Sequence, residues 1–327
     1  MGCQHLIRIA VAVAVMLGAA AAAAQDVGAY PAKRMEIIVP FPAGGTADFL
    51  ARLIGQKLAE SWGQPVVVSN KPGATGSLGA EIAAQAPPDG HTLLVTSYAN
   101  RGVLFTPDPP TPQPARDLVP VAVLIQAPLV LVAHPALPAR SVRELLVLAA
   151  EKQGALNYAS IGNGTPSHLA MEMLKKSAAV KMTHVPYKGS AQALADVIAG
   201  HVPMMFDSVV SSSEQVKGGK LKALAVSTST RLPTLPNVPT ISESGVPGFD
   251  VFTWAVLYVP EGTPANRMDK LRDAMGRILK MPDVVERLAA QGAIVPDSMT
   301  QAQVIAFVRD DVAMWRKLIK ETAIQAD

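Results

Sequence analysis

Two short glycine-bearing stretches carry the residue types that bind anions through the backbone. The first, residues 40–48, reads Pro-Phe-Pro-Ala-Gly-Gly-Thr-Ala-Asp and lies between an apolar run and an amphipathic run. Gly44 and Gly45 permit close approach of the backbone, and Thr46 is predicted to cap the helix that follows. Because the first turn of a helix has N–H groups without partners at the positive end of the dipole, this stretch could hold a carboxylate.

The second stretch, residues 160–168, reads Ser-Ile-Gly-Asn-Gly-Thr-Pro-Ser-His and has the same setting. Thr165 suits the N-cap and Pro166 the first helical position. Gly162 and Gly164 do not complete a dinucleotide-binding motif, because Ser167 stands where the third glycine belongs. Either stretch taken alone could be a tight strand-to-helix connection. Together they predict two helix starts, one in each half of the chain, that face each other across a cleft.

Asp48 and Asp207 are the acidic side chains that could take part in chemistry. Asp48 falls in the first turn of a predicted helix, where it could stabilise the dipole or face a ligand. Asp207 ends a predicted strand, and the carboxyl ends of strands are where α/β sheets bind ligands. His168 could lie near a ligand or pack locally. The chain has no Gly-x-Ser-x-Gly or Ser-x-x-Lys motif, so we predict no catalytic residues.

The remaining sequence must supply elements that position these residues. From Met35 onward, short apolar runs alternate with helical stretches, which predicts α/β layers in two lobes joined by extended strands. The last predicted helix carries an apolar stripe, which we interpret as the face by which this helix docks on the protein. Strands are predicted at 35–41, 64–69, 91–97, 118–132, 156–160, 182–186, 203–207, 221–227 and 251–259. Helices are predicted at 47–62, 79–85, 142–151, 169–178 and 191–199, with two or three more at the C-terminus.

Composition excludes several classes of partner and site. The formal net charge is only +3 and the cations are scattered among acids, so no nucleic-acid partner is predicted. Apart from His5, the histidines lie at positions 91, 134, 168, 184 and 201; they show no pairing at four-residue spacing, and no cysteine accompanies them. We therefore predict no metal site and no cofactor. A proline-rich run at 107–114 is predicted to be a surface loop.

The first 24 residues are predicted to be a secretory signal peptide. One cation precedes an unbroken run of apolar and small residues, and Ala22-Ala23-Ala24 before Gln25 suits the cleavage rule. A retained membrane anchor is the alternative, although the run is alanine-rich and short for one. Cys3 is the only cysteine, so cleavage near Ala24/Gln25 leaves a mature chain without thiols. These features predict a periplasmic protein.

Longer stretches give the chain a family resemblance. From about Tyr30 to the C-terminus it resembles the Bug receptors, the periplasmic binding proteins of tripartite tricarboxylate transporters. The resemblance rests on these segments in collinear order: residues 30–31, 38–45, 63–68, 70–73, 88–94, 156–160, 162–165, 184–189, 205–207 and 219–226. Ala43 departs from the family by replacing a usual second proline, His91 by replacing a frequent tyrosine, and residues 107–114 by their proline content. The last border Tyr98-Ala99-Asn100, a segment that could touch ligand.

The resemblance implies the fold and the site. The fold would be α/β and two-lobed like periplasmic binding proteins, a class II Venus flytrap with two crossing hinge strands. Lobe 1 would comprise residues 25–128 and 246–327, and lobe 2 residues 129–245. The ligand-binding residues implied for lobe 1 are Phe41, Gly44, Gly45, Thr46 and Asp48; those for lobe 2 are Asn163, Gly164, Thr165, Ser167, His168, Tyr187 and Asp207.

The same resemblance implies a function. A small carboxylate, of the organic acid or acidic amino acid type, would bind between the lobes. The bound carboxylate would then pass to a membrane permease of one large and one small subunit, with the receptor acting as a monomer. Two alternatives stay open at this point: a receptor that presents its ligand to a membrane sensor, and a periplasmic hydrolase or isomerase that uses Asp48, His168 or Asp207.

Overall fold

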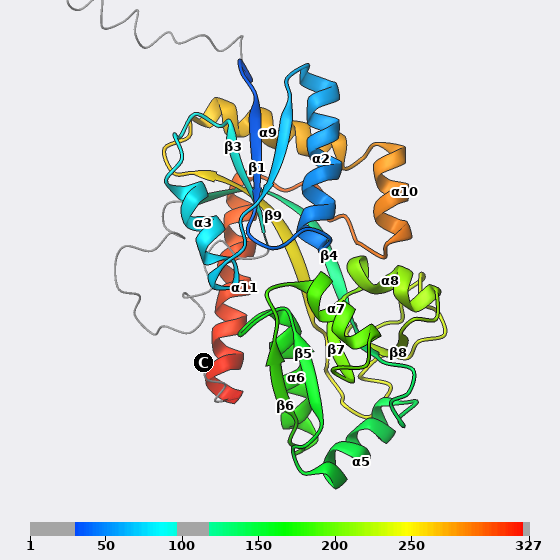
Figure 1. Cartoon of the computed structure of the whole chain (residues 1–327). Helices are drawn as coiled ribbons and strands as arrows, with labels where there is room; N and C mark the ends of the chain where they lie inside the picture. Colours follow the sequence, from blue (N-terminus) through cyan, green and yellow to red (C-terminus); the bar gives the residue numbers. More distant parts are fainter. Residues whose placement is uncertain (1–29, 97–117, 323–327) are drawn as a thin grey trace, which may run out of the picture.

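The computed structural model describes residues 30–96 and 118–322. The predicted signal peptide, the segment 98–100 and the proline-rich run 107–114 lie outside the described residues. Strands and helices alternate along most of the chain, as predicted (Figure 1). The strands are β1 (Met35–Val39), β2 (Val66–Asn70), β3 (Thr92–Thr96), β4 (Leu118–Ala133), β5 (Asn157–Ser160), β6 (Thr183–Pro186), β7 (Met204–Ser208), β8 (Lys222–Val226) and β9 (Phe252–Pro260).

Helices follow most of the strands and cover the sheets on both faces. One of them, α8, was not expected. The α-helices are α2 (Thr46–Trp62), α3 (Ser77–Ala84), α5 (Val142–Lys152), α6 (Pro166–Ser177), α7 (Ser190–Ile198), α8 (Val209–Lys217), α9 (Ala265–Ile278), α10 (Pro282–Ala290) and α11 (Gln301–Thr322), and a 3-10 turn η1 spans Ala74–Gly76. Within the described residues, none of these helices is both long enough and apolar enough to cross a membrane.

The strands form two connected sheets. The path of hydrogen-bonded neighbours is β2-β1-β3-β9-β4-β7-β5-β6, and β8 also pairs with β4. Pairing is parallel among β1, β2 and β3 and among β5, β6 and β7, whereas β4 and β9 run antiparallel to their neighbours. Parallel strands joined through helices need both faces covered, which the helices provide.

Strand β4 connects the two sheets. Its residues 118–128 pair with β9 in the first sheet, and residues 129–133 pair with β7 and β8 in the second. The chain returns beside it, because the amide of Val251 donates to the carbonyl of Ser227 just before β9 begins. Two extended segments therefore cross between the sheets, as the sequence predicted. The fold is α/β, as predicted, with a mixed sheet and helices between the strands.

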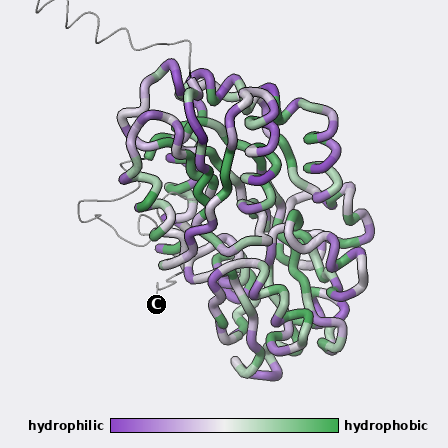
Figure 2. Tube along the Cα trace, turned by 45° about the horizontal axis from the view of Figure 1, so that its top comes forward, coloured by the Kyte–Doolittle hydropathy of each residue, from purple (hydrophilic) through white to green (hydrophobic). Residues whose placement is uncertain are grey.

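Alternate residues of the strands enter two different hydrophobic clusters, because successive side chains of a strand point to opposite faces. Ile37 and Met205 belong to one cluster and Ile38 and Phe206 to the other, so each cluster draws on both sheets. Hydrophobic segments accordingly concentrate in the interior of both halves (Figure 2). Helix α11 buries Trp315 in the second cluster and contacts both β4 and α6, so it also connects the halves.

Candidate anion-binding site

A cavity of about 690 Å³, its open mouth included, lies where the two sheets meet. Residues from the first sheet and its helices form one wall, and residues from the second form the other. Strands β4 and β9 form its floor. The lining residues are Phe41, Pro42, Gly45, Thr46, Ala47, Asp48, Ala127, Leu129, Ile161, Pro166, Ser167, Ser190, Asp207, Ser208, Ser211, Thr253, Trp254 and Ala255.

Four helices begin at this cavity. The lining includes residues at the starts of α2, α6, α7 and α8. Each helix start presents N–H groups that have no partner within the helix, and each contributes about half a positive charge. Among the described residues the lining contains no lysine, arginine or histidine. Attraction of an anion to this cavity would therefore have to come from backbone dipoles.

The first predicted loop opens onto the cavity. The N-cap of α2 is Gly45 rather than the predicted Thr46, and no side chain caps the helix. Thr46 is the first helical residue, and it lines the cavity together with Gly45. Gly45 holds the extended conformation of an N-cap (φ −92°, ψ 175°) and leaves the α2 amides without a competing side-chain acceptor.

Asp48 holds this loop in place. Its Oδ2 accepts from the Gly44 amide (3.1 Å) and from Nε of Arg52 (3.0 Å), and its Oδ1 accepts from Nδ2 of Asn70 (3.0 Å). Asn70 also donates to the carbonyl of Phe41 at 3.0 Å. Burial acts to raise the pKa of Asp48, but these hydrogen bonds and the Arg52 charge outweigh it and leave the pKa lowered. Asp48 is therefore an ionised anchor for the loop, and the Gly44 amide is committed to it.

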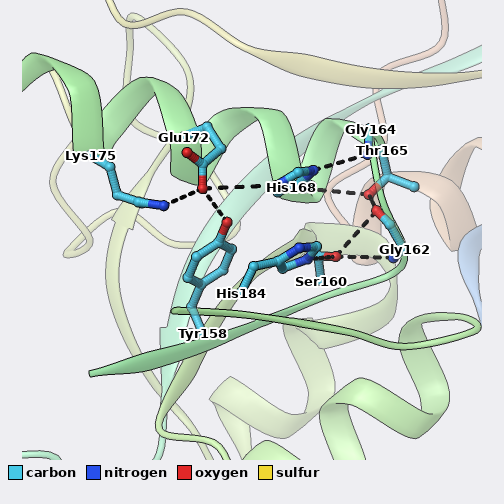
Figure 3. A network of polar contacts seen from close by, with 9 residues as sticks. All are labelled: Tyr158, Ser160, Gly162, Gly164, Thr165, His168, Glu172, Lys175 and His184. Atoms are coloured by element: carbon cyan, nitrogen blue, oxygen red, sulfur yellow. Dashed lines mark hydrogen bonds and ion pairs between the residues drawn. The ribbon is translucent and has the colours of Figure 1, made fainter. Parts of the chain in front are cut away.

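The second predicted loop is closed on itself. Nδ1 of His168 accepts from the Gly164 amide at 3.0 Å, and Oγ1 of Thr165 accepts from the His168 amide at 3.4 Å and donates to the Gly162 carbonyl at 2.6 Å (Figure 3). Gly164, Thr165 and His168 do not line the cavity. Of the two glycines expected to face one cavity, Gly45 lines it, whereas the Gly164 amide is engaged by His168.

His168 belongs to a stack of rings inside the second half. Its ring lies parallel to that of His184, with centroids 3.9 Å apart, and Tyr158 continues the stack (Figure 3). Its Nε2 lies 3.8 Å from Glu172, which also contacts Tyr158 and Lys175. His168 is 6% exposed. Of the two roles open to it from the sequence, local packing is the one that this geometry supports.

Two further predicted residues also lie away from the cavity lining. The Tyr187 hydroxyl donates to Oδ2 of Asp196 at 2.6 Å, and burial, together with the Asp196 carboxylate, raises the pKa of Tyr187 to about 12. Asn163 is half-buried in the second loop. The predicted residues that do line the cavity are Phe41, Gly45, Thr46, Asp48, Ser167 and Asp207.

The start of α7 also reaches the cavity, although the sequence did not single it out. Its N-cap is Gly189, with no side-chain cap, and Ser190 lines the cavity. An added Cβ at Gly45 would lie 3.8 Å from Cβ of Ser190, and one at Gly189 would lie 3.0 Å from Cδ of Pro42. The uncapped starts of α2 and α7 therefore meet from opposite sheets. The sequence contained a signal for this helix start, because Gly189 follows a predicted strand and precedes a predicted helix.

The second loop instead makes a contact between the two halves. A Cβ added at Gly162 would lie 2.3 Å from Cγ2 of Thr75, a residue of η1. Gly162 has φ +129° and Thr75 has φ +50°, so both adopt backbone conformations that are rare for residues with side chains. This close approach requires glycine at position 162. The halves thus touch on two sides of the cavity.

Asp207 lies at the inner wall, 2% exposed, at the end of β7. Ser190 donates to its Oδ1 at 2.8 Å and Ser211 to its Oδ2 at 2.6 Å. Burial raises the pKa of Asp207 to about 6, although the two hydroxyls and the Ser208 amide act in the opposite direction. Nearby, the Ser167 hydroxyl donates to the carbonyl of Phe206.

Comparison with known proteins identifies the family of this chain. Residues 50–324 match the sequence profile of the tripartite tricarboxylate transporter family receptors, TctC. The chain belongs to this receptor family. Protein BugT of Bordetella pertussis is 33% identical to this TctC receptor over 98% of both chains.

Solved structures of similar receptors include two with bound acids. Rpa4515 of Rhodopseudomonas palustris with adipate is 32% identical, with a TM-score of 0.85 over 90% of this chain and 99% of that one. MatC (Rpa3494) of the same organism, with bound malate, is 34% identical, with a TM-score of 0.82 over 88% of this chain and 99% of that one. The resemblance to the Bug receptors is thereby confirmed.

Proposed function

We propose that this TctC receptor works in the periplasm, where it captures a small carboxylate between two lobes, 25–128 with 246–327 and 129–245. It then delivers the carboxylate to a membrane permease of one large and one small subunit, and it does not alter the ligand chemically. The hinge lies in β4, where pairing passes from one sheet to the other, and in the return segment before β9.

The observation that carries this proposal is the meeting of two uncapped helix starts from opposite sheets. The α2 start and the α7 start both reach the cavity. A carboxylate placed between them would accept hydrogen bonds from N–H groups of both lobes. Closure of the two lobes would thereby depend on the ligand. We assign the second-lobe contacts to the α7 start at Ser190, in place of Gly164.

The energetics allow binding without a cationic side chain. Micromolar affinity corresponds to about −8 kcal/mol. Hydrogen bonds to a charged group contribute roughly 1.5–3 kcal/mol each, and a few of them exceed the cost of ordering the ligand. Phe41, Leu129 and Trp254 in the lining would pack against the hydrocarbon part of the acid. Adipate and malate in the related structures support a carboxylate as the ligand class.

The enzymatic alternative named three groups, and this geometry engages two of them in structural contacts, leaving Asp207 at the cavity. A general acid or base needs to reach the substrate. His168 lies in a ring stack off the cavity, and both oxygens of Asp48 are engaged by Arg52, Asn70 and the Gly44 amide. Presentation of the closed form to a membrane sensor is compatible with the same site. We favour delivery to a permease because the family is one of transporter receptors.

Calorimetric titration of the purified protein with adipate, malate and a wider set of organic acids tests the proposal. We expect at least one acid to bind at a single saturable site and to be recovered unchanged. Sugars, nucleotides and metal cations serve as comparison compounds. If only those compounds bind, or if a bound acid is converted, the proposed function is wrong.

A further inference from the structure

Asp207 occupies an unusual position for an acid in an anion-binding cavity. It is 2% exposed, and it lies beside the starts of α7 and α8, which would attract the ligand carboxylate. Ser190 begins α7 and also donates its hydroxyl proton to Asp207. A carboxylate held by the α7 amides would therefore be a close neighbour of the Asp207 carboxyl group. Two neighbouring negative charges in a buried site repel each other strongly.

The described residues around Asp207 supply no cationic side chain. Its hydrogen bonds come from Ser190 of α7, Ser211 of α8 and the Ser208 amide, and the neighbouring residues of β4 are apolar. On α6, which packs against β7, Ser167 bonds to the Phe206 carbonyl and His168 is stacked on His184. Across the cavity stands Asp48, itself an acid. Among the described residues no lysine or arginine forms an ion pair with Asp207.

We propose that the Asp207 carboxyl group takes up a proton when a carboxylate binds in the cavity, so that ligand capture is coupled to protonation. This inference rests on the proposed function. The protonated group would relieve the repulsion and gain an O–H donor that can face the ligand. Asp207 would thus be a specificity determinant. Its ionised form can only accept hydrogen bonds, whereas its protonated form can donate one to the bound acid.

The sign of the pH dependence follows from linkage. In the free protein, burial raises the pKa of Asp207 to about 6, so at neutral pH most molecules carry it ionised. A bound anion raises the pKa further. Because the complex then holds more protons than the free protein, binding tightens as the pH falls. Above about pH 6, affinity should weaken by up to about tenfold per pH unit until the pKa of the complex is reached.

Calorimetry in buffers of different ionisation enthalpy measures the protons taken up on binding. With whichever of adipate, malate and the other acids binds, we expect roughly half to one proton per bound acid at pH 7. Asp207→Asn should reduce this to the value set by the acid alone and flatten the affinity profile between pH 6.5 and 8. Ser211→Ala removes a hydrogen bond that lowers the pKa of Asp207, so it should move the pH-dependent range upward.

A direct reading uses the carbon-13 signal of the Asp207 carboxyl group in the intact protein, with and without saturating acid. We expect its titration midpoint to rise on binding, and this reading holds even if Asp207→Asn fails to fold. An acid that binds without proton uptake, or with an unchanged Asp207 midpoint, would overturn the inference and leave the proposed function standing. If no organic acid binds at all, both are overturned.

Discussion

The first and second glycine loops look alike in sequence, yet they differ in what their backbone amides contact. The first loop ends in an N-cap glycine and leaves the start of α2 at the cavity. In the second loop, Thr165 caps α6 and His168 accepts from Gly164, so these groups of the loop already bond to each other. A side chain that caps a helix competes with any ligand for the same amides. Strong capping residues therefore argue against an anion site at that helix.

The largest effect should come from breaking the contact that the second loop makes. In Gly162→Ala, the new Cβ would lie 2.3 Å from Thr75, so the halves could not approach as closely. We expect the calorimetric affinity for the bound acid to fall on the order of 100-fold, since such overlaps cost about 1–3 kcal/mol. Gly245→Ala is the matched control, because Gly245 also has positive φ but no atom within 4 Å of an added Cβ. Equal losses in both variants would show backbone strain alone.

A smaller loss should follow when one amide of the first loop is removed. Proline at the first helical position is compatible with the helix, so Thr46→Pro deletes an N–H with little effect on α2. We expect affinity to fall roughly tenfold, the value of one hydrogen bond to a charged group. Thr46→Val, which keeps the amide, separates the contribution of the hydroxyl. Ala265→Pro, at the exposed start of α9, controls for the proline and should bind normally.

Much of the fold could be predicted from the sequence. The strands and most helices were predicted because period-2 and period-3.6 apolar patterns are set by local geometry. The stripe Val304, Val308, Val312, Trp315 and Ile319 does pack into a core cluster. Helix α8 was missed, because its sequence begins Val-Val-Ser-Ser-Ser, residues of modest helix propensity.

The site was predicted only in part, since its assembly depends on contacts between segments far apart in the chain. The sequence correctly placed Gly45, Thr46 and Asp207 at strand ends and helix starts, and all three line the cavity. It could not predict that His168 would accept a hydrogen bond from the Gly164 amide or that Ser190 would line the cavity and bond to Asp207. Those outcomes depend on side-chain rotamers and on how the two halves approach each other.

His168, unlike Gly162 in the same loop, should respond to mutation through stability rather than through affinity. His168→Ala removes the acceptor for the Gly164 amide, and we expect the free energy of unfolding to fall by about 1–3 kcal/mol. Affinity should change by less than about threefold if the fold is retained, because no ligand contact is lost. His168→Asn, which can still accept that hydrogen bond, should recover part of the stability. A drop in affinity as large as that of Thr46→Pro would instead make His168 a ligand contact.

The smallest effect concerns acid stability at the first loop. The pKa of Asp48 is lowered in the folded protein, so its ionised form contributes stability that is present above its unfolded pKa and lost as the pH falls through the folded value. Chemical denaturation of Asp48→Asn should therefore show less loss of stability below about pH 4 than the wild type, by on the order of 1 kcal/mol. Identical acid profiles would mean that Asp48 is not the anchor of this loop.

The most direct test is a crystal structure of the protein with a bound organic acid. The account predicts that carboxylate oxygens accept hydrogen bonds from first-turn amides of both α2, at Thr46 or Ala47, and α7, at Ser190 or Ala191, while the Gly164 amide still donates to His168. A carboxylate bound through Gly164 and the opened second loop, with no contact to the α7 start, would contradict it.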